Sequence, residues 1–145
     1  MGFTTPSYSL KDLFARAERG ELQLPDFQRE YIWDVDRIRT LVTSVLRGYP
    51  IGSFLALDTR NAPMRFRPRP LDGLTTGDRE PGLLLLDGQQ RLTSLFYALK
   101  GAGEIPTVDY LGRRIRRRFF VDVRAAVAAD PMPVEAVFAL SLIHI

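Results

Sequence analysis

Four consecutive leucines, Leu83–Leu86, constrain the fold most strongly, because they run directly into the polar residues 87–91. A short apolar run bounded by Pro81-Gly82 and Asp87-Gly88 is typical of a buried strand. Helical spacing then begins, with apolar residues at Leu92, Leu95, Phe96 and Leu99. The sequence therefore predicts a strand, a polar turn and a helix in direct succession.

The polar turn has the composition of an anion site. The first N–H groups of a helix lack intrahelical partners, and Gly88 allows a positive φ and close approach. Arg91 adds a planar cation suited to phosphate, and Asp87 is suited to accept a proton or hold a metal ion. These features favour a phosphate or nucleotide site. The alternative is structural, with Asp87 capping the helix and Gln89, Gln90 and Arg91 forming its solvated first turn.

Composition narrows the chemistry. The chain has 145 residues, of which 46% are hydrophobic and 26% charged, which is typical of a globular protein with its own core. The absence of cysteine excludes disulfides, zinc–thiolate sites and cysteine nucleophiles, and the single histidine, His144, argues against histidine catalysis. No membrane span or leader peptide is evident. We expect a cytoplasmic protein whose chemistry uses carboxylates, arginines and amides.

Capping residues predict two helices ahead of the polar turn. Ser9 followed by Asp12 resembles a capping box and predicts a helix over about 10–19. Asp34 as N-cap and Gly48 as stop enclose a second helix with one apolar face.

Strand patterns lie at residues 21–25, 51–58 and 119–123. Residues 59–81 are rich in Pro, Gly and Arg, which predicts a mobile surface loop or an irregular hairpin. Residues 135–140 begin a helix-like pattern.

The net charge of +3 is compatible with a polyanionic partner. The densest positive run consists of Arg113, Arg114, Arg116, Arg117 and Arg118. This run is a candidate nucleic-acid contact, and a basic hairpin without a ligand explains it equally well.

Residues 24–33, 44–53 and 86–93 together carry a family resemblance. In their order and spacing, the chain resembles the N-terminal domain of the GmrSD-type modification-dependent restriction enzymes, the DGQQR-motif family related in fold to ParB and sulfiredoxin. The resemblance implies an α+β fold with a small mixed sheet and helices, truncated at its C-terminus. We expect residues 1–140 to form this incomplete domain and residues 141–145 to be a non-native tail.

The resemblance also implies binding and hydrolysis of a nucleoside triphosphate with Mg²⁺, which regulates restriction of modified or phage DNA. The implied catalytic residues are Asp87, Gln89 and Gln90, with Asp87 also the metal ligand. The implied phosphate-binding residues are Gln28, Arg29, Gly88 and Arg91. Further expected partners are DNA and, in the full-length parent, a C-terminal HNH-type nuclease domain.

Other functions stay open. One is a non-catalytic DNA-binding or nucleotide-sensing module of ParB-like type, which the arginine run motivates. A phosphodiesterase activity within this domain is a weaker option, and an inactive fragment is a third.

Overall fold

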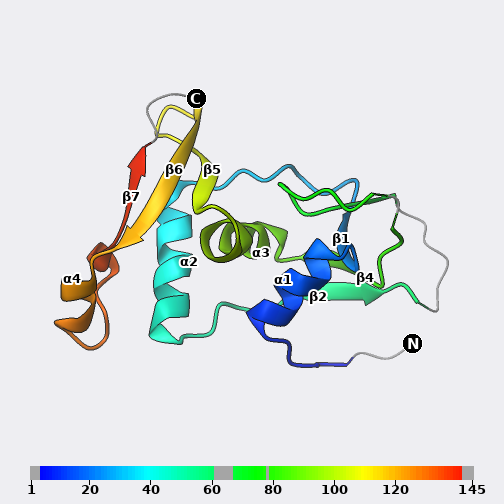
Figure 1. Cartoon of the computed structure of the whole chain (residues 1–145), viewed down its shortest axis with the longest axis horizontal. Coiled ribbons are helices and arrows are strands. Elements are labelled where there is room, and N and C mark those ends of the chain that lie inside the picture. The colour runs from blue at the N-terminus through cyan, green and yellow to red at the C-terminus, as the bar shows by residue number, and fades with distance from the viewer. Residues whose placement is uncertain (1–3, 61–66, 78, 142–145) are drawn as a thin grey trace. The chain divides into compact units, whose positions relative to one another are not determined.

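The computed structural model describes residues 4–60, 67–77 and 79–141 (Figure 1). The chain divides into two compact units, Met1–Arg29 with Phe54–Asp87 and Glu30–Ser53 with Gly88–Ile145. Helices occur together with parallel and antiparallel strand pairs, which confirms the predicted α+β class. The likeness to ParB and sulfiredoxin and the expected boundary at residue 140 stay predictions.

The first unit holds one helix and a four-stranded sheet. Its elements are α1 (Leu10–Glu18), β1 (Leu22–Pro25), β2 (Leu55–Asp58), β3 (Pro68–Arg69) and β4 (Leu83–Asp87). The strand order is β2-β4-β1-β3, in which β1 and β4 run parallel and the other two pairs are antiparallel. Leu84 and Leu85 are buried in the middle of β4, so the leucine run forms the expected buried strand.

The second unit holds the other helices and a separate sheet. Its elements are α2 (Val35–Arg47), α3 (Gln89–Leu95), the π-helical turn η1 (Phe96–Lys100), β5 (Glu104–Val108), β6 (Arg114–Val121), α4 (Val123–Val127), the 3₁₀ turn η2 (Val134–Ala136) and β7 (Val137–Ser141). The antiparallel sheet has the order β5-β6-β7. Its core joins Ile38 and Val42 of α2 to Ile105 and Val137 of the sheet.

The two predicted early helices are confirmed with their caps. The Ser9 hydroxyl accepts from the Asp12 N–H at 3.0 Å, and the Asp34 carboxylate accepts from the Arg37 N–H at 2.9 Å. Gly48 ends α2 in the left-handed region, with φ 74°. Local capping chemistry was therefore sufficient to define these helices.

Several strand predictions were wrong in extent. The strand expected over 51–58 begins only at Leu55, and the one expected over 119–123 begins at Arg114 and gives way to α4. Residues 104–108, for which no strand was predicted, form β5. The reason is that β6 pairs with β5 on one side and with β7 on the other. The hydrogen bonds between these strands outweigh the low strand propensity of the individual segments.

The helix-like pattern over 135–140 was also wrong. Val137–Ser141 forms β7, which pairs antiparallel with β6, and only a short 3₁₀ turn precedes it. Residues 142–145, which include His144, lie outside the described residues.

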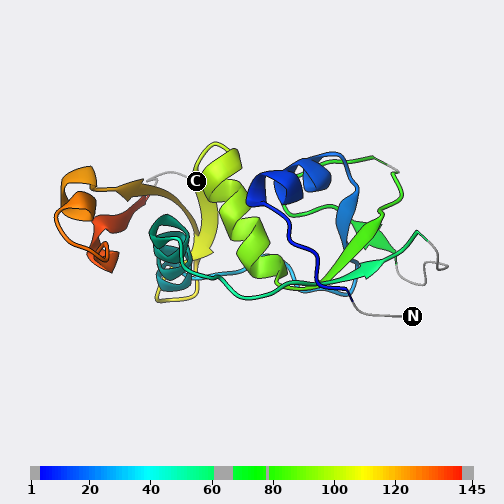
Figure 2. The same ribbon diagram turned by 90° about the horizontal axis from the view of Figure 1, so that it is seen from below.

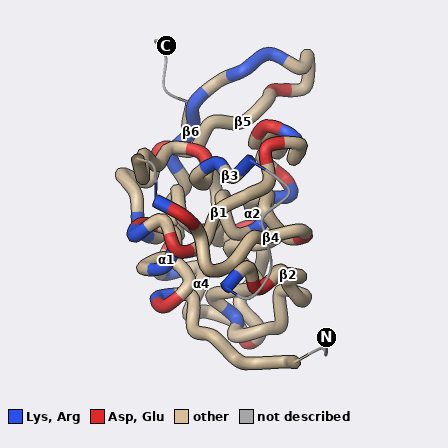
Figure 3. Tube along the Cα trace, turned by 90° about the vertical axis from the view of Figure 1, so that its right-hand side faces the viewer, with Lys and Arg blue, Asp and Glu red and all other residues tan. Residues whose placement is uncertain are grey.

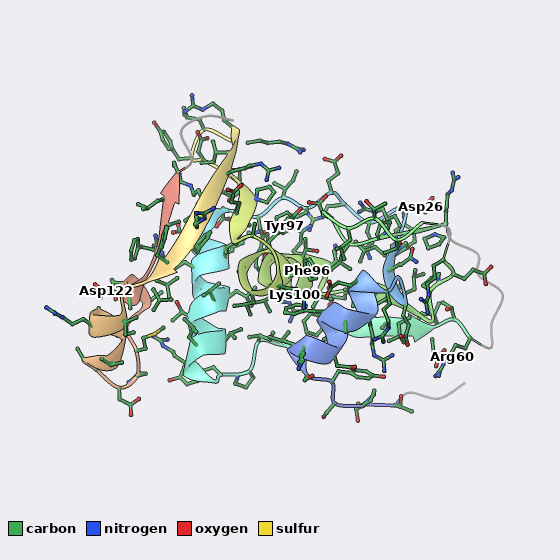
Figure 4. All side chains as sticks on the ribbon, in the orientation of Figure 1. Asp26, Arg60, Phe96, Tyr97, Lys100 and Asp122 are labelled. Atoms are coloured by element: carbon green, nitrogen blue, oxygen red, sulfur yellow. The ribbon has the colours of Figure 1, made fainter. Side chains whose placement is uncertain are left out.

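The motif helix changes its winding halfway. Figure 2 shows α3 and η1 as one continuous helix, and the second part is wound as a π-helix. Phe96, Tyr97 and Lys100 lie on this wider part (Figure 4). The expected apolar face of the helix does not continue into this part: Leu92 and Leu95 are fully buried, whereas Leu99 is 50% exposed. The reason is that the wider winding changes the direction of the side chains that follow.

The described residues of the segment 59–81, which are 59–60, 67–77 and 79–81, are irregular apart from β3, which pairs with β1. Leu71 is buried, so part of this segment belongs to the core of the first unit. Residues 61–66 and 78, including Arg65, lie outside the described residues. Within the described parts of the chain, no helix is both long and apolar enough to cross a membrane.

Candidate functional site

The polar turn lies where β4 ends and α3 begins, as the sequence predicts. Asp87 is the last residue of β4 and is exposed. Gly88, not Asp87, is the N-cap of α3, with φ 97°. The interpretation of Asp87 as the helix cap was therefore wrong. Since glycine has no side chain, the cap residue itself places no acceptor over the first N–H groups of α3.

Gln28 connects the upstream Gln-Arg pair to the end of β4 within the first unit. Its Nε2 donates to the Leu86 carbonyl oxygen at 2.7 Å, one residue before Asp87. Arg69 Nη2 supports this arrangement by donating to the carbonyl oxygens of Gln28 and Arg29, at 2.7 and 2.9 Å. The sequence alone did not reveal this role of Arg69, because its partners lie 40 and 41 residues away in the sequence.

Gln90 is buried, with 9% of its surface exposed, so its interpretation as part of a solvated first turn was wrong. Its Oε1 accepts from the Ile32 N–H and its Nε2 donates to the Glu30 carbonyl oxygen, both at 3.1 Å. One turn later, Ser94 shares a 2.7 Å hydrogen bond with the Tyr31 hydroxyl. The side of α3 that carries Gln90 and Ser94 therefore holds the segment 30–32 in place.

Arg91 holds a third segment of the second unit. Its Nη1 donates to the Ile51 carbonyl oxygen at 2.6 Å, and its Nη2 donates to the Ser53 carbonyl oxygen at 2.7 Å. Gly52, between these carbonyls, has φ 95°, and a Cβ there would overlap the Arg91 guanidinium. Arg91 thus fixes a loop that only glycine fits.

The three segments that carry the family resemblance are thereby joined by hydrogen bonds. Gln28 links residues 24–33 to residues 86–93 in the first unit. In the second unit, Gln90 links the same two segments again, and Arg91 adds residues 44–53. The sequence indicated that these segments belong together, and the side-chain-to-backbone contacts show how they meet.

Substitution of Gly52 by alanine is expected to break the hydrogen bonds from Arg91 to the carbonyl oxygens of Ile51 and Ser53. Gly48→Ala is the matched control, because Gly48 also has a positive φ (74°) but an added Cβ would meet nothing within 4 Å. Both variants bear the left-handed backbone cost of about 1 kcal/mol. Gly52→Ala should lose at least about 1 kcal/mol more in urea unfolding, since two charge-assisted hydrogen bonds are disturbed. Equal losses in the two variants would contradict this role of Arg91.

A groove of about 420 Å³ opens along α2. Its size lies within the range of about 300–1,000 Å³ that is typical of small-molecule sites. The groove is lined by Trp33, Asp36, Arg37, Thr40, Leu41, Ser44, Pro50 and Ile51. Trp33 directly follows the segment that Gln90 holds, and Ile51 accepts from Arg91. Two residues of the polar turn therefore hold the chain segments that contribute Trp33 and Ile51 to the groove lining.

The groove combines one aromatic ring with charged and hydroxyl groups. The Thr40 and Ser44 hydroxyls donate to carbonyl oxygens of their own helix, at 2.8 and 3.0 Å, so their oxygens remain acceptors toward the groove. Thr107 fixes the Trp33 backbone by donating to its carbonyl oxygen. Trp33 packs against the core of the second unit and also lines the groove. The polar face of α2 next to a tryptophan was the available signal for the groove.

The basic run does not form one patch. Strand alternation in β6 exposes Arg114, Arg116 and Arg118 on one face and turns Arg117 to the other, where it is half-buried. Arg113 lies outside the strand, in the turn before β6. In Figure 3, basic positions follow β6. The five arginines therefore cannot contact a single ligand together.

Arg113 has a structural partner in that turn. Its Nε donates to Asp109 at 2.8 Å, and its backbone N–H donates to the same carboxylate at 2.9 Å. The backbone hydrogen bond from Arg113 is the main cause that lowers the pKa of Asp109 below its usual value, because it stabilises the charged carboxylate.

Comparison with known proteins gives the family. Residues 10–132 match the GmrSD restriction endonuclease, N-terminal domain. An uncharacterised protein of Methanocaldococcus jannaschii is 36% identical over 129 residues, which cover 84% of this chain and 21% of the relative. The chain therefore spans about a fifth of the length of this curated relative.

Proposed function

Because the chain belongs to the family of the N-terminal domain of GmrSD restriction endonucleases, we propose that it binds and hydrolyses a nucleoside triphosphate within a restriction system directed at modified or phage DNA. The observation that supports this proposal best is the set of hydrogen bonds joining the three family segments around the Asp87–Arg91 turn. Gln28 fixes the end of β4 within the first unit, and Gln90 and Arg91 fix their neighbours within the second unit. Residues fixed in this way are preorganised, which is the main requirement of phosphoryl-transfer catalysis.

The proposed phosphate ligands are Gln28, Arg29, Gly88 and Arg91. Gly88 allows a phosphate to approach the backbone at the start of α3. Arg91 donates from Nη1 and Nη2 to carbonyl oxygens, and its guanidinium keeps its positive charge while it does so. Arg91 therefore has a double role in this proposal, to hold the loop 51–53 and to contribute charge.

Asp87 is the proposed ligand of Mg²⁺ and the group that orients the attacking water, with Gln89 assisting. The described residues contain no group of three or more metal-ligating side chains. A single exposed carboxylate still fits Mg²⁺, because this ion is usually bound by one or two carboxylates together with substrate phosphates and waters. When bound, the ion would neutralise charge on the phosphates, while Asp87 keeps it at the end of β4.

The α2 groove is the proposed site for the base and sugar. Trp33 offers an aromatic face for stacking, and the Thr40 and Ser44 oxygens offer acceptors. Hydrogen bonds from Gln90 and Arg91 of α3 hold Ile32, next to Trp33, and Ile51 in place, so the position of the groove lining depends on α3.

Trp33 is the single tryptophan of the chain, so its fluorescence reports directly on this groove. Addition of a Mg²⁺–nucleoside triphosphate is expected to change this fluorescence saturably, with phosphate released at the same concentrations. Inorganic phosphate alone should leave the signal unchanged, because it has no base to stack. If triphosphates in the millimolar range neither change the fluorescence nor release phosphate, the proposal fails.

One observation favours a second function, nucleotide sensing without hydrolysis. Gln90, proposed as catalytic, has both ends of its amide engaged with backbone groups. A saturable fluorescence change without phosphate release would support sensing. In either case we propose that the remainder of the longer protein supplies the nuclease, as the expected HNH-type domain.

A further inference from the structure

The sheet β5-β6-β7 has two chemically different faces. One face contributes Ile105, Thr107 and Val137, which are buried. The other face is exposed along the central strand, where Arg114, Arg116, Arg118 and Phe120 occupy alternate positions. We call this second side the outer face.

Aromatic and aliphatic side chains occupy one end of the outer face. Phe120 of β6 lies opposite Phe138 of β7, and their rings stack with centroids 5.6 Å apart and planes 21° apart. The two residues are 39% and 37% exposed, and Leu140, opposite Arg118, is 54% exposed. Each ring packs one side against its neighbour and keeps more than a third of its surface exposed, so the pair offers apolar ring surface on the same face as the arginine row.

The arginine row is weakly neutralised. Arg114 pairs with Glu30 at 2.9 Å and Arg118 with Glu104 at 3.0 Å, and all four side chains are at least a third exposed. Exposed ion pairs of this kind contribute about 0–1 kcal/mol, so a phosphate can replace the carboxylate at little cost. Arg116 lies opposite Pro106, which offers no carboxylate. Charge on this face therefore favours an anionic ligand.

We infer that the outer face binds single-stranded nucleic acid. Arginines along one strand neutralise a phosphate backbone, while exposed aromatic rings stack on unpaired bases, and this combination is used by other single-strand-binding sheets. A duplex is a poorer ligand, because its bases are already stacked and its contact would use the arginines alone. This inference does not depend on the proposed nucleotide hydrolysis, since it uses neither the Asp87–Arg91 turn nor the α2 groove.

The test measures binding of a fluorescent oligothymidylate about 12 nucleotides long, within the range of roughly 4–16 nucleotides covered by one binding domain. The 145-residue chain should bind it more tightly than a duplex of equal length. Phe120→Leu should weaken binding about tenfold, whereas Phe120→Tyr should retain it, because only tyrosine keeps the stacking ring. A wild-type affinity for Phe120→Leu would overturn the inference, because the exposed ring would then take no part in binding.

Salt dependence tests the arginine row. Arg116→Gln should reduce the slope of log affinity against log salt by about 0.7, the value for one phosphate contact on a single strand. The matched control is Arg124→Gln on α4, an exposed arginine outside the outer face, which should keep the wild-type slope. Equal slopes for both variants, or equal affinity for duplex and single strand, would overturn the inference.

Two further readouts separate folding and function. The far-ultraviolet circular dichroism of Phe120→Leu should match that of the wild type. If it does not, the affinities of the other two variants test the inference: Phe120→Tyr should bind the oligothymidylate as the wild type does, and Arg116→Gln should show the reduced salt slope. Phosphate release by Phe120→Leu should also be unchanged. Loss of oligonucleotide binding with intact phosphate release supports the outer face whether or not the groove assignment is correct.

Discussion

Replacement of Asp87 by asparagine is expected to lower nucleoside triphosphate turnover by about 10²–10⁴-fold, the usual contribution of a positioned acid or base. The amide keeps the size of the side chain but cannot accept a proton and binds Mg²⁺ poorly. Stability should be unchanged, because Asp87 is exposed at the end of β4 and does not cap α3. Phosphate release measures turnover, and Trp33 fluorescence measures the remaining nucleotide binding.

Glu80→Gln is the control, since Glu80 is an exposed carboxylate of the same unit that lies ahead of β4. It should turn over at the wild-type rate. If Asp87→Asn retained the wild-type rate as well, Asp87 would have no role in hydrolysis, and the assignment of Asp87 as metal ligand and catalytic residue would fail.

Replacement of Gln90 by leucine is expected to destabilise the second unit by about 2–4 kcal/mol. Leucine has a similar volume, but the Ile32 N–H and the Glu30 carbonyl oxygen both lose their partner. Each partly buried backbone group left without a partner costs about 1–3 kcal/mol. Urea unfolding followed by Trp33 fluorescence measures the loss as a lower midpoint.

Gln90→Glu gives the comparison. A carboxylate can still accept from the Ile32 N–H, but it cannot donate to the Glu30 carbonyl oxygen and it places a charge at a buried position, so the loss should be at least as large as for Gln90→Leu. If Gln90→Leu lost turnover without any loss of stability, the residue would act in catalysis alone and not as a clamp.

The two substitutions affect neighbouring positions of one motif in different ways. Asp87 ends a strand of the first unit and has an exposed carboxylate, whereas Gln90 is buried in the second unit. A loss of turnover in the Asp87 variant and a loss of stability in the Gln90 variant would show that the motif has both a catalytic and a structural role.

The sequence by itself determined the elements that depend on local chemistry. Ser9 and Asp34 define the starts of α1 and α2 through their own side-chain hydrogen bonds, and Gly48 ends α2. The leucine run formed a buried strand followed directly by a helix, so the polar turn lies where it was predicted. The family was also identifiable from residues alone, because three spaced motifs identify it without any contact being known.

Tertiary structure alone decided what the motif side chains do. Gln90 and Arg91 look like solvated or ligand-binding residues in the sequence, and their hydrogen bonds to residues 30–32 and 51–53 come from segments about 40–60 positions away. The long β6 and the strand β7 formed against local preference, because pairing between distant strands satisfies backbone groups that no local pattern reveals. Strand pairing also divided the arginine run between two faces, since neighbouring residues of a strand point in opposite directions.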